Sequence, residues 1–239
     1  MQEIQIDGTQ RFYARFAGVM YLLNYATSVF GSLTPDRIRG SGDFAEQARR
    51  VAASEFLYRT ALTSMAIGWV LIVFLAFSLY VTLKPVNKRL AQLALLLEIC
   101  QAAVGAVTVI FSFMLLGLYT TPSGSFQNDQ LNALVRIFSA NFSGFNISMI
   151  FLGIGSAIFF YLFYKSRYIP RLLAGWGVFA SVVMVFVSAA MILFPENSRT
   201  LQFGWGPLGI AEIGTALWLT IVGIRPPRAR LGQLAATPG

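Results

Sequence analysis

The apolar residues of this chain fall in six blocks of about 17 to 29 residues, and no other feature limits the fold so strongly. At a rise of 1.5 Å per helical residue, such a block crosses a hydrocarbon core of ~30 Å. Hydrophobic residues make up 56% of the chain and charged residues 12%, against roughly half and a quarter in soluble domains. The sequence therefore predicts an all-α protein, a polytopic membrane helix bundle of about six transmembrane helices.

The predicted spans are separated by short polar or proline-containing segments. They cover approximately residues 16–33, 61–83, 90–119, 144–164, 172–194 and 207–224. Residues 1–15 then form a cytoplasmic N-terminal segment, residues 16–224 the transmembrane domain, and residues 225–239 a cytoplasmic basic tail. We expect the first block to be an uncleaved span, because its apolar character continues beyond the small residues 26–28 to Leu33.

The distribution of basic residues predicts the orientation. Eleven Lys and Arg residues lie on the side of the two termini and seven on the opposite side. Because cytoplasmic loops are enriched in Lys and Arg, both termini are assigned to the cytoplasm.

Two loops carry helical patterns too short to span a membrane. Asp43 and Glu46 have the spacing of an N-cap pair, and apolar residues recur at helical spacing after them. Residues 128–142 show a similar pattern. We therefore expect short interfacial helices in the first and third loops.

Several classes of chemistry are excluded by composition. The chain has no histidine and a single cysteine, Cys100, which rules out histidine-ligated metals, serine-histidine catalysis and multi-cysteine metal sites within the chain. Neither a Gly-rich phosphate loop nor a nucleophile elbow is present. We expect no metal and no cofactor. The net charge of +8 lies in the short connections, so the expected partners are membrane lipids and other membrane subunits, and no nucleic acid.

Two glutamates lie inside predicted spans, together with Asn24 in the first. A carboxylate at such depth costs ~2.5 to 3.5 kcal/mol, which makes Glu98 and Glu212 candidates for an intramembrane polar site. They would bind a proton, a cation or an amine-bearing substrate, with Gln101 and Thr215 nearby. The alternative is that each carboxyl is neutral or hydrogen-bonded and fixes helix packing. Because the two glutamates lie at different distances from the ends of their spans, the sequence does not require them to meet.

A second candidate site lies at the outer interface. Glu55 and Arg59 are one helical turn apart at the start of the second span and are expected to form an ion pair, most simply a structural anchor. Arg136, in the third loop, is a candidate partner for Glu212.

The chain resembles an uncharacterised group of bacterial membrane proteins, domain of unknown function 4386. The resemblance is carried by short motifs in a fixed order: Arg15-Phe16-Ala17-Gly18, Gly42-Asp43, Ala52-Ala53-Ser54-Glu55-Phe56-Leu57-Tyr58-Arg59, Leu83-Lys84-Pro85-Val86-Asn87, Ser166-Arg167-Tyr168-Ile169-Pro170-Arg171, and Ala211-Glu212 with Leu217-Trp218-Leu219. It implies a multi-pass protein of the bacterial inner (cytoplasmic) membrane and supplies no activity. Glu55, Arg59 and Glu212 fall within its motifs.

Three interpretations of function remain open at this point. The first is a non-enzymatic membrane protein, standing alone or serving as an accessory subunit of a membrane assembly. The second is a small carrier or proton-linked transporter that uses the intramembrane glutamates, which requires a polar cavity at the middle of the bundle. The third is an intramembrane lipid-modifying enzyme at the outer interface.

Overall fold

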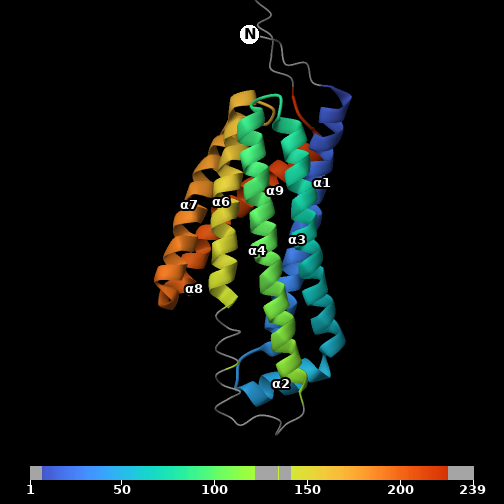
Figure 1. Ribbon diagram of the computed structural model, residues 1–239, viewed down its shortest axis with the longest axis vertical. Helices are drawn as coiled ribbons and strands as arrows, with labels where there is room; N and C mark the ends of the chain where they lie inside the picture. The colour runs from blue at the N-terminus through green and yellow to red at the C-terminus, as the bar shows by residue number, and fades with distance from the viewer. Residues whose placement is uncertain (1–6, 122–133, 135–140, 226–239) are drawn as a thin grey trace, which may run out of the picture.

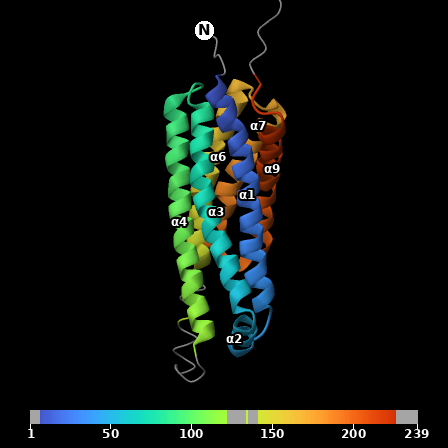
Figure 2. The ribbon, with the colours of Figure 1, turned by 90° about the vertical axis from the view of Figure 1, so that its right-hand side faces the viewer.

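The structure, a computed structural model, describes residues 7–121, 134 and 141–225, and its long helices run alongside one another in one bundle (Figure 1). Their contacts close the bundle into a ring. Around the ring each helix packs on the next in the order α1, α3, α4, α6, α7, α9, and α9 closes the ring on α1. Figure 2 shows α1 lying between α3 and α9. The ring encloses the space in which the candidate site lies.

The helices of the described residues are mostly long. Their bounds are α1 Gly8–Arg39, α2 Phe44–Ala53, α3 Glu55–Leu83, α4 Lys88–Thr120, α6 Asn141–Ser166, α7 Arg171–Leu193, α8 Ser198–Leu201 and α9 Gly206–Ile221, with short 3-10 turns at Pro195–Asn197 and Gln202–Trp205. Five of them, α1, α3, α4, the 144–166 part of α6, and α7, are long and apolar enough to cross a membrane. The predicted all-α membrane bundle is confirmed.

The sixth predicted span is the shorter helix α9. Its 16 residues extend about 24 Å at 1.5 Å per residue, less than the ~30 Å of a hydrocarbon core. It nevertheless occupies a full place in the ring, because it packs on both α1 and α7.

The first helix is longer than predicted at both ends. It begins at Gly8, where the Asp7 side chain accepts a hydrogen bond of 2.6 Å from the backbone N–H of Gln10, as an N-cap residue does. It continues through Pro35 to Arg39, whereas the sequence predicted an end at Pro35. Residues 8–15, predicted as part of a terminal segment, are therefore helical.

The predicted interfacial helix of the first loop is confirmed as α2. Asp43 accepts a 2.8 Å hydrogen bond from the backbone N–H of Glu46, and Val51 is fully buried. Tyr119 of α4 stacks on Phe44 at 5.0 Å between ring centroids and fixes α2 across the end of the bundle. The second predicted interfacial helix, residues 128–142, lies mostly outside the described residues.

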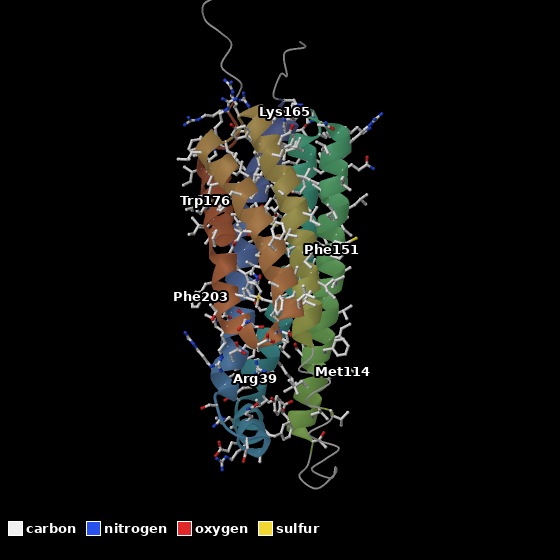
Figure 3. The ribbon with its side chains drawn as sticks, turned by 90° about the vertical axis from the view of Figure 1, so that its left-hand side faces the viewer. Arg39, Met114, Phe151, Lys165, Trp176 and Phe203 are labelled. Carbon is white, nitrogen blue, oxygen red and sulfur yellow. The ribbon has the colours of Figure 1, made fainter. Side chains whose placement is uncertain are left out.

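The two ends of the bundle differ. The N-terminal end holds the start of α1, the end of α9 and the tight turns between α3 and α4 and between α6 and α7; the opposite end, here the α2 end, holds α2 (Figure 1). Figure 3 shows Lys165 at the first end and Arg39 towards the second, with the apolar side chains of Met114, Phe151 and Trp176 along the shaft between them. Large apolar side chains are exposed along every long helix, as expected of a surface that faces lipid.

A buried glutamine joins three elements at the N-terminal end. Gln10 of α1 is 3% exposed, and its Nε2 donates to the backbone oxygen of Thr82 at 2.7 Å and to the Tyr168 hydroxyl at 2.9 Å. Burial raises the pKa of Tyr168 above its ordinary value, whereas the hydrogen bond from Gln10 lowers it. The hydroxyl is therefore neutral at physiological pH, and the contact ties α1 to α3 and to the turn between α6 and α7.

A paired-glutamate chamber as the candidate functional site

Glu98 and Glu212 lie at the same level of the bundle. Glu98 is the tenth residue after the first of α4, and Glu212 is the ninth before the last of α9. Since α4 begins and α9 ends at the N-terminal end, both glutamates are about 14 to 15 Å from it at 1.5 Å per residue. The sequence left open whether the two would meet, and the structure brings them together in one chamber.

Both carboxyl groups are buried and surrounded by hydroxyl groups. Glu98 is 5% exposed and Glu212 is 8% exposed. The Tyr25 hydroxyl of α1 donates to Glu212 Oε2 at 2.7 Å, and the Ser156 hydroxyl of α6 donates to Glu98 Oε1 at 3.3 Å. Ser156 also interacts with the Glu212 carboxyl. Ser156 thus lines the inner chamber together with both acids.

A glycine makes room for the Glu98 carboxyl against α6. A methyl group added at Gly155 would lie 2.7 Å from Glu98 Oε1, closer than van der Waals contact allows. The carboxyl therefore occupies space that any other residue at this position would fill.

The inner chamber is small, and polar and apolar side chains line it together. It has a volume of about 60 Å³, and Tyr21, Asn24 and Gln101 line it together with the two glutamates. Asn24 Nδ2 donates to the backbone oxygen of Gly68 at 2.9 Å, which holds the amide between α1 and α3. Asn24 and Gln101, named with the glutamates from sequence, are in the site; Thr215 is fully buried but does not line the chamber.

A larger, mostly apolar chamber adjoins the inner one on the side of the α2 end. Its volume is about 390 Å³, and it shares Asn24, Gln101 and Glu212 with the inner chamber. Trp69 and Trp205 line it with three methionines. Both tryptophans therefore face the interior of the bundle.

The inner chamber is sealed towards the N-terminal end. Between it and that end the helices pack through fully buried side chains, among them Ala17, Leu83, Ala94 and Leu162. Beyond them lies the Gln10 contact with Thr82 and Tyr168. The larger chamber therefore extends from the level of Glu212 towards the α2 end.

The second candidate site is not part of this chamber. Arg59 Nε lies 2.7 Å from Glu55 Oε1, and both side chains are substantially exposed, at 51% and 39%. The predicted ion pair is confirmed, and neither residue lines a chamber that contains Glu212. Arg136 lies outside the described residues, and the hydrogen-bond partner that the structure gives Glu212 is Tyr25.

Sequence reasoning missed Tyr21, Tyr25 and Ser156. All three carry hydroxyl groups within apolar blocks, where serine and tyrosine are too common to be singled out. For the two tyrosines, the available signal was their spacing. Tyr21 and Tyr25 lie one helical turn apart and flank Asn24, which places three polar side chains in the middle of one span.

Comparison with known proteins places the chain in a family but not in a functional class. The family model described as "Domain of unknown function (DUF4386)" matches residues 16–223. No curated protein and no solved structure matches the chain.

Proposed function

This chain belongs to the DUF4386 family of domains of unknown function, and from the geometry of its interior we propose that it is a small proton-linked carrier. The observation that carries the proposal is that Glu98 and Glu212 line one chamber in the middle of a ring of membrane-spanning-type helices. Ionisable residues at such depth mark ion and substrate pathways in membrane proteins.

The chamber contains acids without a basic partner. None of its described lining residues is a lysine or an arginine. Two carboxyl groups close together in a medium of low dielectric constant are stable only when protons or a cation neutralise them. A site that holds either protons or a cation has the property that proton-linked exchange requires.

The shape of the interior supports a carrier that alternates between two sides. The larger chamber extends towards the α2 end, and the inner one is sealed at the N-terminal end, as expected for one of the two access states. With both termini in the cytoplasm, this is the state that faces outward. In the other state the contact of Gln10 with Thr82 and Tyr168 opens.

The two other interpretations have less support. Glu55 and Arg59 do not share a chamber with Glu212, so no set of groups for lipid chemistry at the outer interface is assembled among the described residues. An accessory subunit needs no chamber of this kind. The carrier is therefore the interpretation that accounts for the chamber.

The test is uptake by purified protein in liposomes. Liposomes with an acidic or an alkaline interior are incubated with a mixture of cellular small molecules, and mass spectrometry identifies the solutes retained inside. We expect at least one solute to accumulate against its gradient only when a pH gradient is present. The matched variants Glu98→Gln and Glu212→Gln should abolish this accumulation, and the surface variant Glu55→Gln should not. If no solute accumulates above the level of protein-free liposomes, the carrier proposal is wrong.

A further inference from the structure

We propose that the substrate is an organic cation whose ammonium group binds at Glu212 and whose apolar, ring-sized body occupies the larger chamber. This inference rests on the proposed function and names its substrate class. It also assigns a different role to each acid: Glu212 binds the cation, and Glu98 binds the proton that is exchanged for it.

The walls of the larger chamber suit an apolar body that carries a positive charge. The Phe145 ring lies 6.4 Å from that of Trp69 and 5.6 Å from that of Trp205, tilted by 68° and 58°. Such a cluster presents ring faces and edges to one space, and tryptophan faces attract cations. Met65, Met149 and Met184 complete the apolar wall, and methionine adapts to ligands of different outline.

The charge of the chamber selects against anions. Among the described residues that line it, Glu212 is the only acid and none is a base. An anion there would lie beside a carboxyl group in a medium of low dielectric constant, where like charges repel strongly. An ammonium group gains the opposite interaction, and it also donates hydrogen bonds that a carboxylate accepts.

Polar atoms without partners give independent support for a ligand. Gln101, which lines both chambers, is 2% exposed, and its Oε1 accepts no hydrogen bond; the Nε1 of Trp69, which is 7% exposed, donates none. The Nε1 of Trp205 also has no partner. A buried polar group without a partner costs ~1 to 3 kcal/mol. These three side chains line the larger chamber, so a small rotation of each would bring its polar atom to a ligand that carries an ammonium donor and one acceptor.

The sizes of the chambers separate the roles of the acids. Glu98 lines only the inner chamber, whose volume of about 60 Å³ has room for water molecules but not for a ring. Glu212 lines both chambers. A bound organic cation therefore reaches Glu212 with its ammonium group, and Glu98 is left to a proton. One proton leaves the chamber for each monovalent cation that enters, so the total charge of the site is unchanged.

The test uses a series of ammonium compounds with matched neutral and anionic counterparts. The series contains methylammonium, 2-phenylethylammonium and tryptammonium; for the second, 2-phenylethanol and 3-phenylpropanoate are the counterparts. Binding to the full chain in lipid nanodiscs is measured by calorimetry. We expect a ring-bearing ammonium compound to bind at least ten times more tightly than methylammonium and than its own counterparts.

The variants distinguish the two acids. Glu212→Gln should weaken binding of the best ammonium compound at least tenfold, and Glu98→Gln should change it less than threefold while abolishing the release of protons on binding. Glu55→Gln, a surface acid, is the matched control and should behave as the wild type. The inference is overturned if no ammonium compound binds better than its neutral counterpart, or if Glu212→Gln binds unchanged.

The outcomes separate this inference from the proposed function. Selective binding of an ammonium compound without proton-linked uptake would overturn the carrier and leave the ligand class standing. Proton-linked uptake of a neutral or anionic solute through Glu98 and Glu212 would confirm the carrier and overturn the ligand class.

Discussion

At the scale of single residues, the position of the Glu98 carboxyl depends on the absence of one methyl group. In Gly155→Ala the new Cβ would lie 2.7 Å from Glu98 Oε1. Because the obstructing atom is the end of a flexible side chain, the carboxyl moves and α6 keeps its place. We expect proton-linked uptake in proteoliposomes to fall about tenfold, equivalent to ~1.4 kcal/mol, with thermal stability unchanged.

Gly117→Ala is the matched control for this prediction. It introduces the same group into α4, where nothing lies within 4 Å of the new Cβ. Its uptake should equal that of the wild type. Equal uptake in the two alanine variants would mean that the position of the Glu98 carboxyl does not matter for transport.

Helix α1 contacts both of its neighbours in the ring through glycines. A Cβ at Gly18 would lie 2.6 Å from the backbone nitrogen of Thr220 and 2.8 Å from the backbone oxygen of Ala216. Backbone atoms cannot move aside, so Gly18→Ala should separate α1 from α9 and lower the free energy of unfolding by ~2 kcal/mol or more. Thermal unfolding in detergent measures the loss.

Gly8→Ala is the control on the same helix. Nothing lies within 4 Å of its new Cβ, so the better helix propensity of alanine should leave stability unchanged or raise it slightly. If Gly18→Ala unfolds at the same temperature as Gly8→Ala, α9 does not depend on close contact with α1 to hold its place in the ring.

The hydrogen bonds of Gln10 join α1 to α3 and to the turn between α6 and α7, and they allow a second prediction about how the helices are held together. Gln10→Leu leaves the buried Tyr168 hydroxyl without its hydrogen-bond donor, at a cost of ~1 to 3 kcal/mol. Tyr168→Phe removes the hydroxyl itself and should cost less. Calorimetric unfolding of both single variants and the double variant tests this: the double variant should be no less stable than Gln10→Leu alone, whereas additive losses would contradict the contact.

The sequence predicted which segments are helical better than it predicted where each helix ends and which of its side chains point inward. Apolar blocks located each long helix of the ring, and the Asp43 and Glu46 spacing located α2, because burial in lipid and capping are local properties of the chain. The end of α1 was predicted wrongly, since Pro35 is tolerated inside a long helix that neighbouring helices support. Position along a helix was predictable, whereas the direction of a side chain around it was not.

The candidate site shows the same limit. Glu98, Glu212 and Asn24 were found because polar groups are costly in a bilayer. That Glu98 and Glu212 meet follows from the ring order of the helices, which hydropathy does not contain. The inward direction of Trp69 and Trp205 could not be predicted for a related reason: tryptophan occurs both at membrane surfaces and around ligands.

At the scale of the whole molecule, the two ends of the bundle differ in how closely they are packed and in how many basic residues they carry. Among the described residues, most of the basic side chains lie at the sealed end, and the larger chamber extends towards the end that holds α2. Three arginines at the α2 end have acidic partners: Arg39 with Asp36, Arg50 with Glu46, and Arg59 with Glu55. The rule for orientation counts basic residues rather than net charge. The three ion pairs therefore do not change the number of basic residues counted on each side of the membrane. They do give these arginines a structural role at the α2 end.

The orientation decides which side of the membrane the larger chamber faces in this state, and it can be measured with single cysteines. Cys100→Ser removes the native thiol, and Ser41→Cys and Lys165→Cys then introduce exposed thiols at the α2 end and at the N-terminal end. A membrane-impermeant maleimide should label residue 41 in right-side-out vesicles and residue 165 only after the membrane is permeabilised. The reverse pattern would place the termini outside, and the chambers would then face the cytoplasm. Because a carrier that exchanges an organic cation for a proton runs down the proton gradient, protons entering from an outward-facing chamber would drive export of the cation.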